Sequence, residues 1–274
     1  MKKLSTATIK KLVKPRISET HKGNYGHALL VAGSQGRMGA AVIATLACMR
    51  AGVGMVTVNV PIAERFIVQV AIPEAMTVMR KDIKQELDVY SAAGIGPGLG
   101  TDAAAKKLLL HILSHFHKPL LLDADALTMI AADEHLFSKV PEGTIFTPHP
   151  KEFDRLFGDH GNEDDRLNTA IQKGLDHQMI IVLKGHHTLI TYMGQSFLNT
   201  TGNAGLAKAG SGDALTGIIT AFLAQGYEPF QAAKLGVFLH GLAADIALKK
   251  QSMESMLITD VIACLGKAWK QVLK

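Results

Sequence analysis

The chain has 274 residues, of which 47% are hydrophobic, 19% charged and 5% aromatic, and its formal net charge is +5. These values are typical of a folded globular protein, and the scarcity of aromatic residues argues against nucleic acid as a partner. No apolar run reaches the roughly 20 residues of a membrane span and the N-terminus has no apolar signal segment, so we expect a soluble, cytoplasmic protein with no membrane partner.

The first half of the chain predicts strands that alternate with helices, which is typical of a mostly parallel sheet with helices on both faces. Residues 27–32 predict a buried strand, and this strand runs into the glycine-containing loop 33–39. The other elements expected in this half are a helix at about 40–51, strands at 55–60 and near 88–93, a glycine loop at 94–100 and a helix from Asp102.

The second half continues the alternation and then becomes helical. Strands are expected at 120–123, 144–147, 179–184 and 187–192. The last two flank Gly185-His186, and so short a join indicates an antiparallel hairpin at one edge of the sheet. From Ala204 onward helices are expected, and because no repeat or linker divides the chain, residues 1–274 are predicted to form a single domain.

Glycine and polar residues gather where the predicted strands end. In parallel α/β sheets the carboxyl ends of the strands border one crevice, and ligands bind there. The sequence therefore predicts one composite site, built from the five segments 33–39, 94–100, 123–125, 147–152 and 184–188.

The strongest local motif is Gly210-Ser211-Gly212-Asp213, which is followed by apolar residues at helical spacing. A glycine turn that enters a helix leaves unpaired amides aimed at an anion, and glycine lets phosphate approach the backbone closely. Asp213 would then accept a proton from a hydroxyl that attacks phosphorus. The alternative is that Ser211 or Asp213 only caps the helix.

Two further groups of residues admit both a functional and a structural interpretation. His149 and Glu152 are three residues apart and share a helix face, where Glu152 would hold Mg²⁺ through water or only complement the helix dipole. Asp123 and Asp125 stand at a strand end, although Asp125 is also a candidate N-cap for a helix from Ala126.

The segment between the last two predicted strands contains Lys184, which is a candidate phosphate ligand at a strand end. The backbone after Lys184 could then wrap around a nucleotide. The competing interpretation is a surface hairpin with incidental histidines. His186 and His187 are expected to point opposite ways in extended chain, and zinc is not expected. His240, in the middle of a helix, is interpreted as a packed residue.

Together the motifs resemble a known family. HALLVAGSQGRMGAA, GIGPGLG, LLDADAL, TPHPKEF, LKGHHT and GNAGLAKAGSGDALTGIITAFLAQG follow one another in the order found in ADP/ATP-dependent NAD(P)H-hydrate dehydratases, a branch of the ribokinase-like superfamily. The resemblance covers nearly the whole chain. It implies a ribokinase-like α/β fold and a hydro-lyase that repairs hydrated NADH or NADPH, using ADP (or ATP) and Mg²⁺ and releasing AMP and phosphate when ADP is the donor.

The resemblance also implies residue assignments. The substrate contacts correspond to Ala40, Gly98, Gly100, His149 and Asp213, with Asp213 facing the reactive hydroxyl. The nucleotide contacts correspond to Lys184, Gly185, His186, His187, Thr188 and Gly212, and the glycine-rich helix start adds Gly210 and Ser211 to the expected nucleotide site. His149 replaces the Asn of the sugar-kinase Asn-x-x-Glu motif, which favours the dehydratase branch.

The resemblance further implies a homotetramer and a separate NAD(P)H-hydrate epimerase as functional partner, because the chain has no segment for that domain. Lys151 stands where relatives carry a smaller residue. Two other functions remain open at this point: a kinase of a small alcohol such as hydroxyethylthiazole or hydroxymethylpyrimidine, and a non-catalytic nucleotide-binding module. The residues do not decide between ADP and ATP, or between the NADH and NADPH hydrates.

Overall fold

The computed structural model describes residues 1–83 and 87–274. The strands in this part of the chain form a single ten-stranded sheet in the order β1-β10-β9-β8-β7-β6-β5-β2-β3-β4. Their bounds are β1 Lys2–Lys3, β2 His27–Val31, β3 Met55–Val60, β4 Met76–Met79, β5 Ala92–Ile95, β6 Leu120–Leu122, β7 Ile145–Phe146, β8 Ile180–Leu183, β9 Leu189–Tyr192 and β10 Gln195–Leu198.

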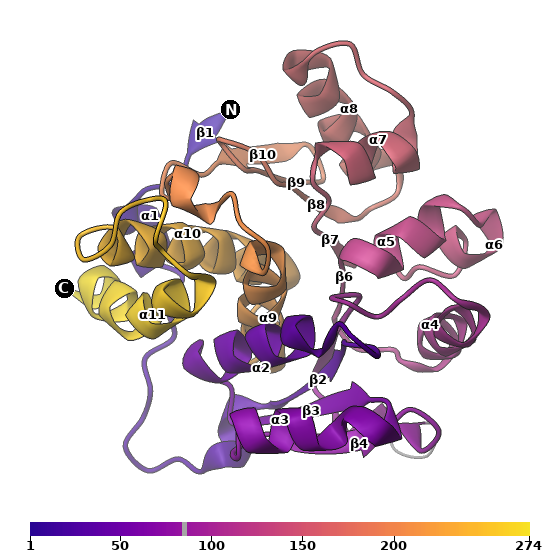
Figure 1. Cartoon of the computed structure of the whole chain (residues 1–274). Coiled ribbons are helices and arrows are strands. Elements are labelled where there is room, and N and C mark those ends of the chain that lie inside the picture. Colours follow the sequence, from indigo (N-terminus) through magenta and orange to yellow (C-terminus); the bar gives the residue numbers. More distant parts are fainter. Residues whose placement is uncertain (84–86) are drawn as a thin grey trace.

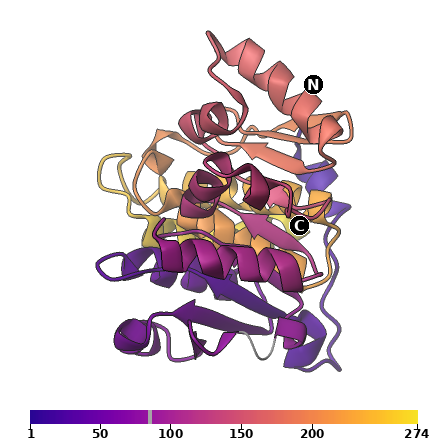
Figure 2. The same ribbon diagram turned by 90° about the vertical axis from the view of Figure 1, so that its right-hand side faces the viewer.

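Helices cover both faces of this sheet, as Figures 1 and 2 show. Successive residues of each buried strand point to opposite faces, so Leu30 packs in one core cluster and Leu29 in the other. The helices are α1 Thr6–Lys10, α2 Met38–Arg50, α3 Arg65–Ala71, α4 Ala103–His115, α5 Ala124–Ala131, α6 Glu134–Phe137, α7 Pro150–Phe157, α8 Glu163–Asp176, α9 Ser211–Ala224, α10 Pro229–Ala247 and α11 Ile258–Leu273. The first core cluster contains residues of α2, α9, α10 and α11, and the second contains residues of α4, α5, α7 and α8.

The predicted α/β class and the antiparallel hairpin are confirmed. All strand pairings are parallel except β8 with β9 and β9 with β10. The hairpin lies near one edge, where β10 and the short β1 extend the sheet beyond β9. The sequence did not predict β1, β4 or β10, which are short and lie at or next to the two edges.

Two local predictions are wrong. The strand expected near 88–93 begins only at Ala92, because Leu87–Val89 form a 3₁₀ turn in which Asp88 and Val89 are exposed. The helix expected from Ala126 begins at Ala124, so Asp125 lies in its first turn and is not its N-cap.

Cys48 and Cys264 are both buried and are free thiols. No helix in the described segments is both long and apolar enough to span a membrane.

The position of α9 depends on a close contact between Gly217 and α2. A Cβ at Gly217 would stand 2.0 Å from the carbonyl oxygen of Ala44, so α2 and α9 approach each other backbone to backbone. We expect Gly217→Ala to lower the free energy of unfolding by about 1–3 kcal/mol or more, because a backbone must move to admit the methyl group. Gly266→Ala in α11 is the matched control, since nothing lies within 4 Å of its added Cβ. Urea titration followed by circular dichroism makes the comparison, and equal stability of the two variants would contradict the contact.

Candidate active site

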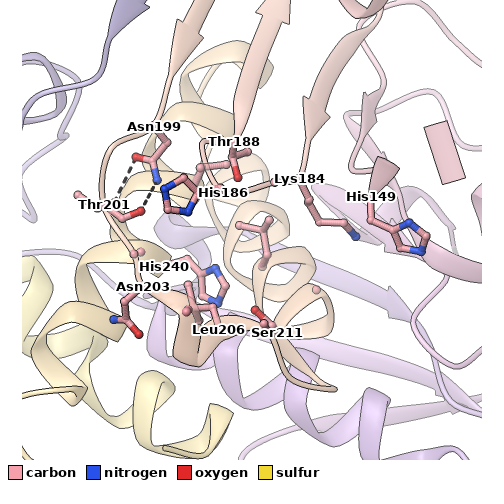
Figure 3. A pocket seen from close by; sticks show the side chains of 18 of the residues that line it. His149, Lys184, His186, Thr188, Asn199, Thr201, Asn203, Leu206, Ser211 and His240 are labelled. Atoms are coloured by element: carbon pink, nitrogen blue, oxygen red, sulfur yellow. Dashed lines mark hydrogen bonds between the residues drawn. The ribbon is translucent and has the colours of Figure 1, made fainter. Parts of the chain in front are cut away.

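A pocket of about 570 Å³ lies at the carboxyl edge of the sheet, beside the start of α9 (Figure 3). Its walls come from segments far apart in the sequence: the start of α7, the turn after β8, the loop after β10, and the helices α9 and α10. The lining residues are His149, Pro150, Lys184, Gly185, His186, Thr188, Asn199, Thr201, Gly202, Asn203, Ala204, Leu206, Ala207, Ser211, Gly212, Leu215, Val237, His240 and Gly241. Of the five segments predicted to form one composite site, 147–152 and 184–188 line this pocket, whereas 33–39, 94–100 and 123–125 do not.

The N-terminus of α9 is open towards this pocket. Gly210 is the N-cap residue in a left-handed conformation with φ of 93°, and among the described residues no side chain caps the helix. The interpretation of Ser211 or Asp213 as a mere cap is therefore wrong. Ser211 and Gly212 line the pocket; the Ser211 amide donates to the Lys208 carbonyl at 3.3 Å, so the Gly212 amide and the positive end of the helix dipole offer an anion site.

Asp213 stands in the first turn of α9, next to that anion site. Burial, followed by the negative charge of Asp123, raises its pKa to about 6, against the opposing effect of Lys184; Asp125 adds a further upward contribution. A carboxylate with a pKa near neutrality is suited to accept a proton and release it again.

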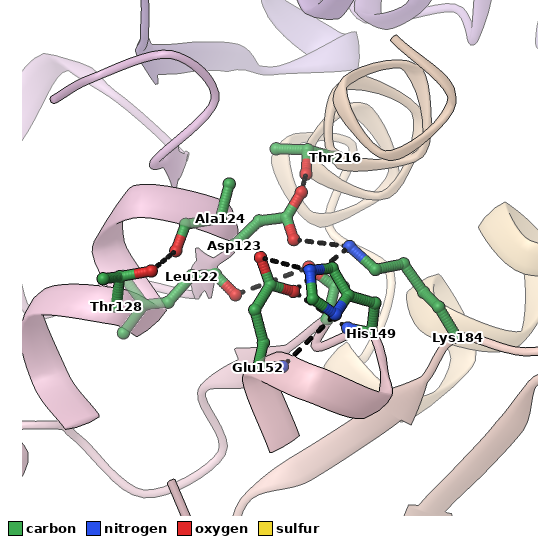
Figure 4. A network of polar contacts seen from close by, with 9 residues as sticks. Leu122, Asp123, Ala124, Thr128, His149, Glu152, Lys184 and Thr216 are labelled. Carbon is green, nitrogen blue, oxygen red and sulfur yellow. Dashed lines mark hydrogen bonds and ion pairs between the residues drawn. The ribbon is translucent and has the colours of Figure 1, made fainter. Parts of the chain in front are cut away.

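A polar network beneath α9 joins Asp123, Lys184 and Glu152 (Figure 4). Asp123 is only 1% exposed, and its two oxygens accept hydrogen bonds from Lys184 Nζ at 2.9 Å and from Thr216 Oγ1 at 2.7 Å. Lys184 Nζ also lies 3.8 Å from a Glu152 oxygen. The network fixes the lysine ammonium at the floor of the pocket, beside Gly212, whose added Cβ would stand 3.3 Å from Nζ.

Lys184 remains charged despite its surroundings. Burial alone would lower its pKa, but the charges of Asp123 and Glu152 and the hydrogen bond to Asp123 outweigh burial, so that the pKa lies above its ordinary value. A permanent cation next to the open helix end favours phosphate binding.

His149 and Glu152 form a reciprocal cap at the start of α7, so the prediction that they share a helix face is confirmed. His149 Nδ1 accepts from the Glu152 amide at 3.2 Å, while a Glu152 oxygen accepts from the His149 amide at 2.8 Å. Because the other Glu152 oxygen lies 3.5 Å from His149 Nε2, both carboxylate oxygens already have partners in the protein. In the described part of the chain, no group of three or more His, Cys, Asp or Glu side chains is arranged to hold a metal ion.

A second set of predicted residues meets where the glycine loop after β5 packs on the start of α2. A Cβ on Gly98, whose φ is +60°, would lie 3.0 Å from the Ala40 Cβ. The Gly100 amide donates to Asp125 at 2.8 Å, and Ser34 Oγ donates to the Gly98 carbonyl at 2.8 Å. Ala40, Gly98 and Gly100, which the sequence assigned to one substrate site, are thus brought together.

Asp125 connects this second set to the residues at the start of α9. Its carboxylate binds the Gly100 amide and contributes to raising the pKa of Asp213, and Asp213 in turn is influenced by Lys184. The charge of Asp213 is thus coupled to Lys184 at the pocket and to Asp125 at the glycine loop.

The structure modifies some residue assignments made from the sequence. Of the predicted nucleotide residues, His187 and Gly210 do not line the pocket. The prediction that His186 and His187 point opposite ways is wrong, because the chain turns there and their ring centroids lie 4.4 Å apart. Sequence reasoning missed the loop 199–207 and His240 as pocket walls; the Asn203-Ala204-Gly205 string was the available signal for the loop.

An α/β sheet of this topology, with an uncapped glycine-rich helix start and an adjacent aspartate, defines an enzyme of the ribokinase-like class. Residues 28–267 match the NAD(P)H-hydrate dehydratase family, and the chain belongs to that family.

Individual relatives agree with this assignment. The chain is 36% identical to the ADP-dependent (S)-NAD(P)H-hydrate dehydratase of Bacillus subtilis, over 93% of each chain. It is also 36% identical to the bifunctional NAD(P)H-hydrate repair enzyme Nnr of Moorella thermoacetica, covering 94% of this chain and 52% of that protein. The chain thus spans about half the length of the bifunctional relatives. A crystal structure of the Bacillus subtilis ADP/ATP-dependent NAD(P)H-hydrate dehydratase, co-crystallized with ATP/Mg²⁺, superposes with a TM-score of 0.89 at 33% identity, over 99% of this chain and 98% of that one.

Proposed function

We propose that this chain is an ADP-dependent (S)-NAD(P)H-hydrate dehydratase, a hydro-lyase that restores NADH or NADPH from the 6S hydrate. The observation that carries the proposal is the uncapped start of α9 beside Asp213, whose pKa is raised to about 6. Relatives bearing that name match over nearly their whole length, and this supports the assignment.

The proposed reaction has two steps. The Asp213 carboxylate takes the proton of the ring hydroxyl, and the hydroxyl oxygen attacks the terminal phosphorus of ADP, so that AMP leaves. The ring nitrogen's lone pair then expels phosphate and a ring proton is lost, which restores the dihydronicotinamide double bond. The amides at Gly212 and the Lys184 ammonium would stabilise the charge on the transferring phosphoryl group.

Mg²⁺ is proposed only as a companion of the nucleotide phosphates, whose charge it would neutralise. Direct ligation by Glu152 does not fit the structure, because both of its oxygens are engaged by His149 and one of them also faces Lys184. A contact through water stays a prediction.

The binding residues, the partner and the assembly are proposals as well. Ala40, Gly98, Gly100 and His149 would contact the hydrate. The nucleotide would contact the pocket-lining residues Lys184, Gly185, His186, Thr188, Ser211 and Gly212, together with the adjacent His187 and Gly210. An epimerase that converts the R hydrate to the S form would be a functional partner. The single domain, the homotetramer and the cytoplasmic location stay predictions.

The direct test mixes the protein with enzymatically prepared NADHX, Mg²⁺ and either ADP or ATP. The proposal expects recovery of dihydronicotinamide absorbance together with one AMP and one phosphate for each NADH when ADP is the donor. A small-alcohol kinase would instead leave a stable phosphorylated product and not restore NADH, and a binding module would show no turnover.

Gly212→Val is expected to weaken ADP binding by about tenfold or more. The valine side chain would extend from a Cβ only 3.3 Å from Lys184 Nζ into the space needed by the phosphate. Isothermal titration with ADP measures the effect, and Gly161→Ala serves as control because Gly161 does not line the pocket and nothing lies within 4 Å of its added Cβ. Unchanged ADP affinity in Gly212→Val would refute the anion-site role.

A further inference from the structure

His240 is buried in the wall of the pocket and has a ring nitrogen without a partner. The residue is 6% exposed, and its Nε2 makes no hydrogen bond to any described residue. Because buried polar atoms are nearly always paired, such an atom in a pocket wall indicates a ligand group that completes it. Figure 3 shows the ring among the side chains that line the pocket.

The neighbouring polar groups of that wall already have partners. Asn199 Nδ2 donates to the Thr201 carbonyl at 2.9 Å, and Thr201 Oγ1 donates to the Phe238 carbonyl at 2.9 Å. Asp245 accepts from the Gly202 amide at 2.9 Å and from Asn203 Nδ2 at 3.0 Å. These hydrogen bonds anchor the loop to α10. The Nε2 atom of His240 is thus the polar atom of this wall that has no hydrogen-bond partner among the described residues.

The surroundings of His240 suit an uncharged part of a ligand. Burial, followed by the charge of Lys184, lowers its pKa to about 4, so the imidazole is neutral at physiological pH and has no charge to attract phosphate. The apolar side chains of Leu206, Leu215 and Val237 line the same pocket. The positive charge of the pocket comes from other lining residues, namely the Lys184 ammonium and the open helix end at Gly212. Apolar walls with few convergent polar groups are typical of sites for flat organic ligands.

We propose that His240 hydrogen-bonds the nucleoside part of the donor through Nε2 and so contributes to the choice of nucleotide. This inference rests on the proposed function, because it takes the pocket to be the donor site. The nucleoside lies against α10 and the loop 199–207, and its phosphates extend towards Gly212 and Lys184.

The test is titration calorimetry at pH 7.5 with two probes, ADP and inorganic pyrophosphate, on the whole chain. His240→Phe keeps a ring of similar size and removes the nitrogen, so ADP affinity should fall about 5- to 15-fold, the value of one buried hydrogen bond, with pyrophosphate affinity unchanged. His240→Gln, which retains a polar end, should recover part of the loss. Phe238→Leu, a buried α10 residue that does not line the pocket, is the control for packing damage.

Three outcomes would overturn the inference. Equal ADP affinity in wild type and His240→Phe removes the contact while leaving the proposed function intact. Equal loss of ADP and pyrophosphate affinity places the effect on the phosphates or on the pocket as a whole. Absence of ADP binding by the wild-type chain defeats the proposed function together with this inference.

Discussion

Asp213→Asn is expected to lower kcat for hydrate repair by about 10²- to 10⁴-fold, with little change in ADP affinity. The amide keeps the size of the side chain but cannot accept the proton of the attacking hydroxyl, and a positioned base is worth rate factors of this order. Turnover assays measure kcat, and titration calorimetry measures the affinity for ADP, so the effects on catalysis and on binding are separated. Near wild-type turnover would show that Asp213 has no catalytic role.

The same residue predicts the pH dependence. The carboxylate is the active form, so activity should rise with pH through about 6 and reach a plateau above it. Asp125→Asn removes one negative charge that raises the pKa of Asp213, so it should move this rise to lower pH.

The melting temperature of Asp213→Asn is the control for damage to the fold. Folding raises the pKa of Asp213 from 3.8 to about 6, so the folded protein holds this proton more tightly and the contribution to stability falls as pH rises through that window. Above pH 6 the ionised carboxylate therefore costs stability, and the Asn variant should melt at the same temperature or higher. A lower melting temperature would mean that lost activity reflects damage to the fold.

Lys184→Met is expected to lower both stability and activity. It leaves Asp123 buried with Thr216 as its remaining hydrogen-bond donor, and removing one partner of a buried ion pair costs about 3–5 kcal/mol. Loss of the ammonium beside the phosphate site should also reduce kcat/KM about 10²- to 10³-fold.

The double variant Lys184→Met with Asp123→Asn separates these two effects. It removes the unpaired buried charge, so stability measured by urea titration should recover most of the loss, whereas kcat/KM should stay low. Recovery of both quantities would show that Lys184 serves the fold alone.

Much of the architecture could be predicted from sequence because each strand signal was local. The runs 27–32, 55–60 and 179–184 are apolar and β-rich, and all three form strands. The edge strands β1 and β4, and β10 next to the edge, were missed because short, partly exposed segments carry no such pattern, and their pairing is set by the strands beside them.

The open helix start beside Asp213 could be predicted for a similar reason, since Gly210-Ser211-Gly212-Asp213 combines a turn, a helix start and a carboxylate within four residues. The paired acid Asp123 and the wall residue His240 depend on contacts between segments far apart in the chain. Asp123 accepts a hydrogen bond from Thr216, and the loop at Thr201 packs closely on α10 beside His240, where a Cβ on Gly241 would lie 2.4 Å from Thr201 Oγ1. Local spacing carries no information about such contacts.

A crystal structure of the protein with ADP bound would show directly whether the start of α9 holds the donor phosphates. We expect a terminal phosphate oxygen about 2.7–3.2 Å from the Gly212 amide and a second one near Lys184 Nζ, with the Asp213 carboxylate facing the phosphorus from the side of Gly98 and Gly100. A nucleotide whose phosphates lie away from the start of α9, with its amides facing only water, would contradict it.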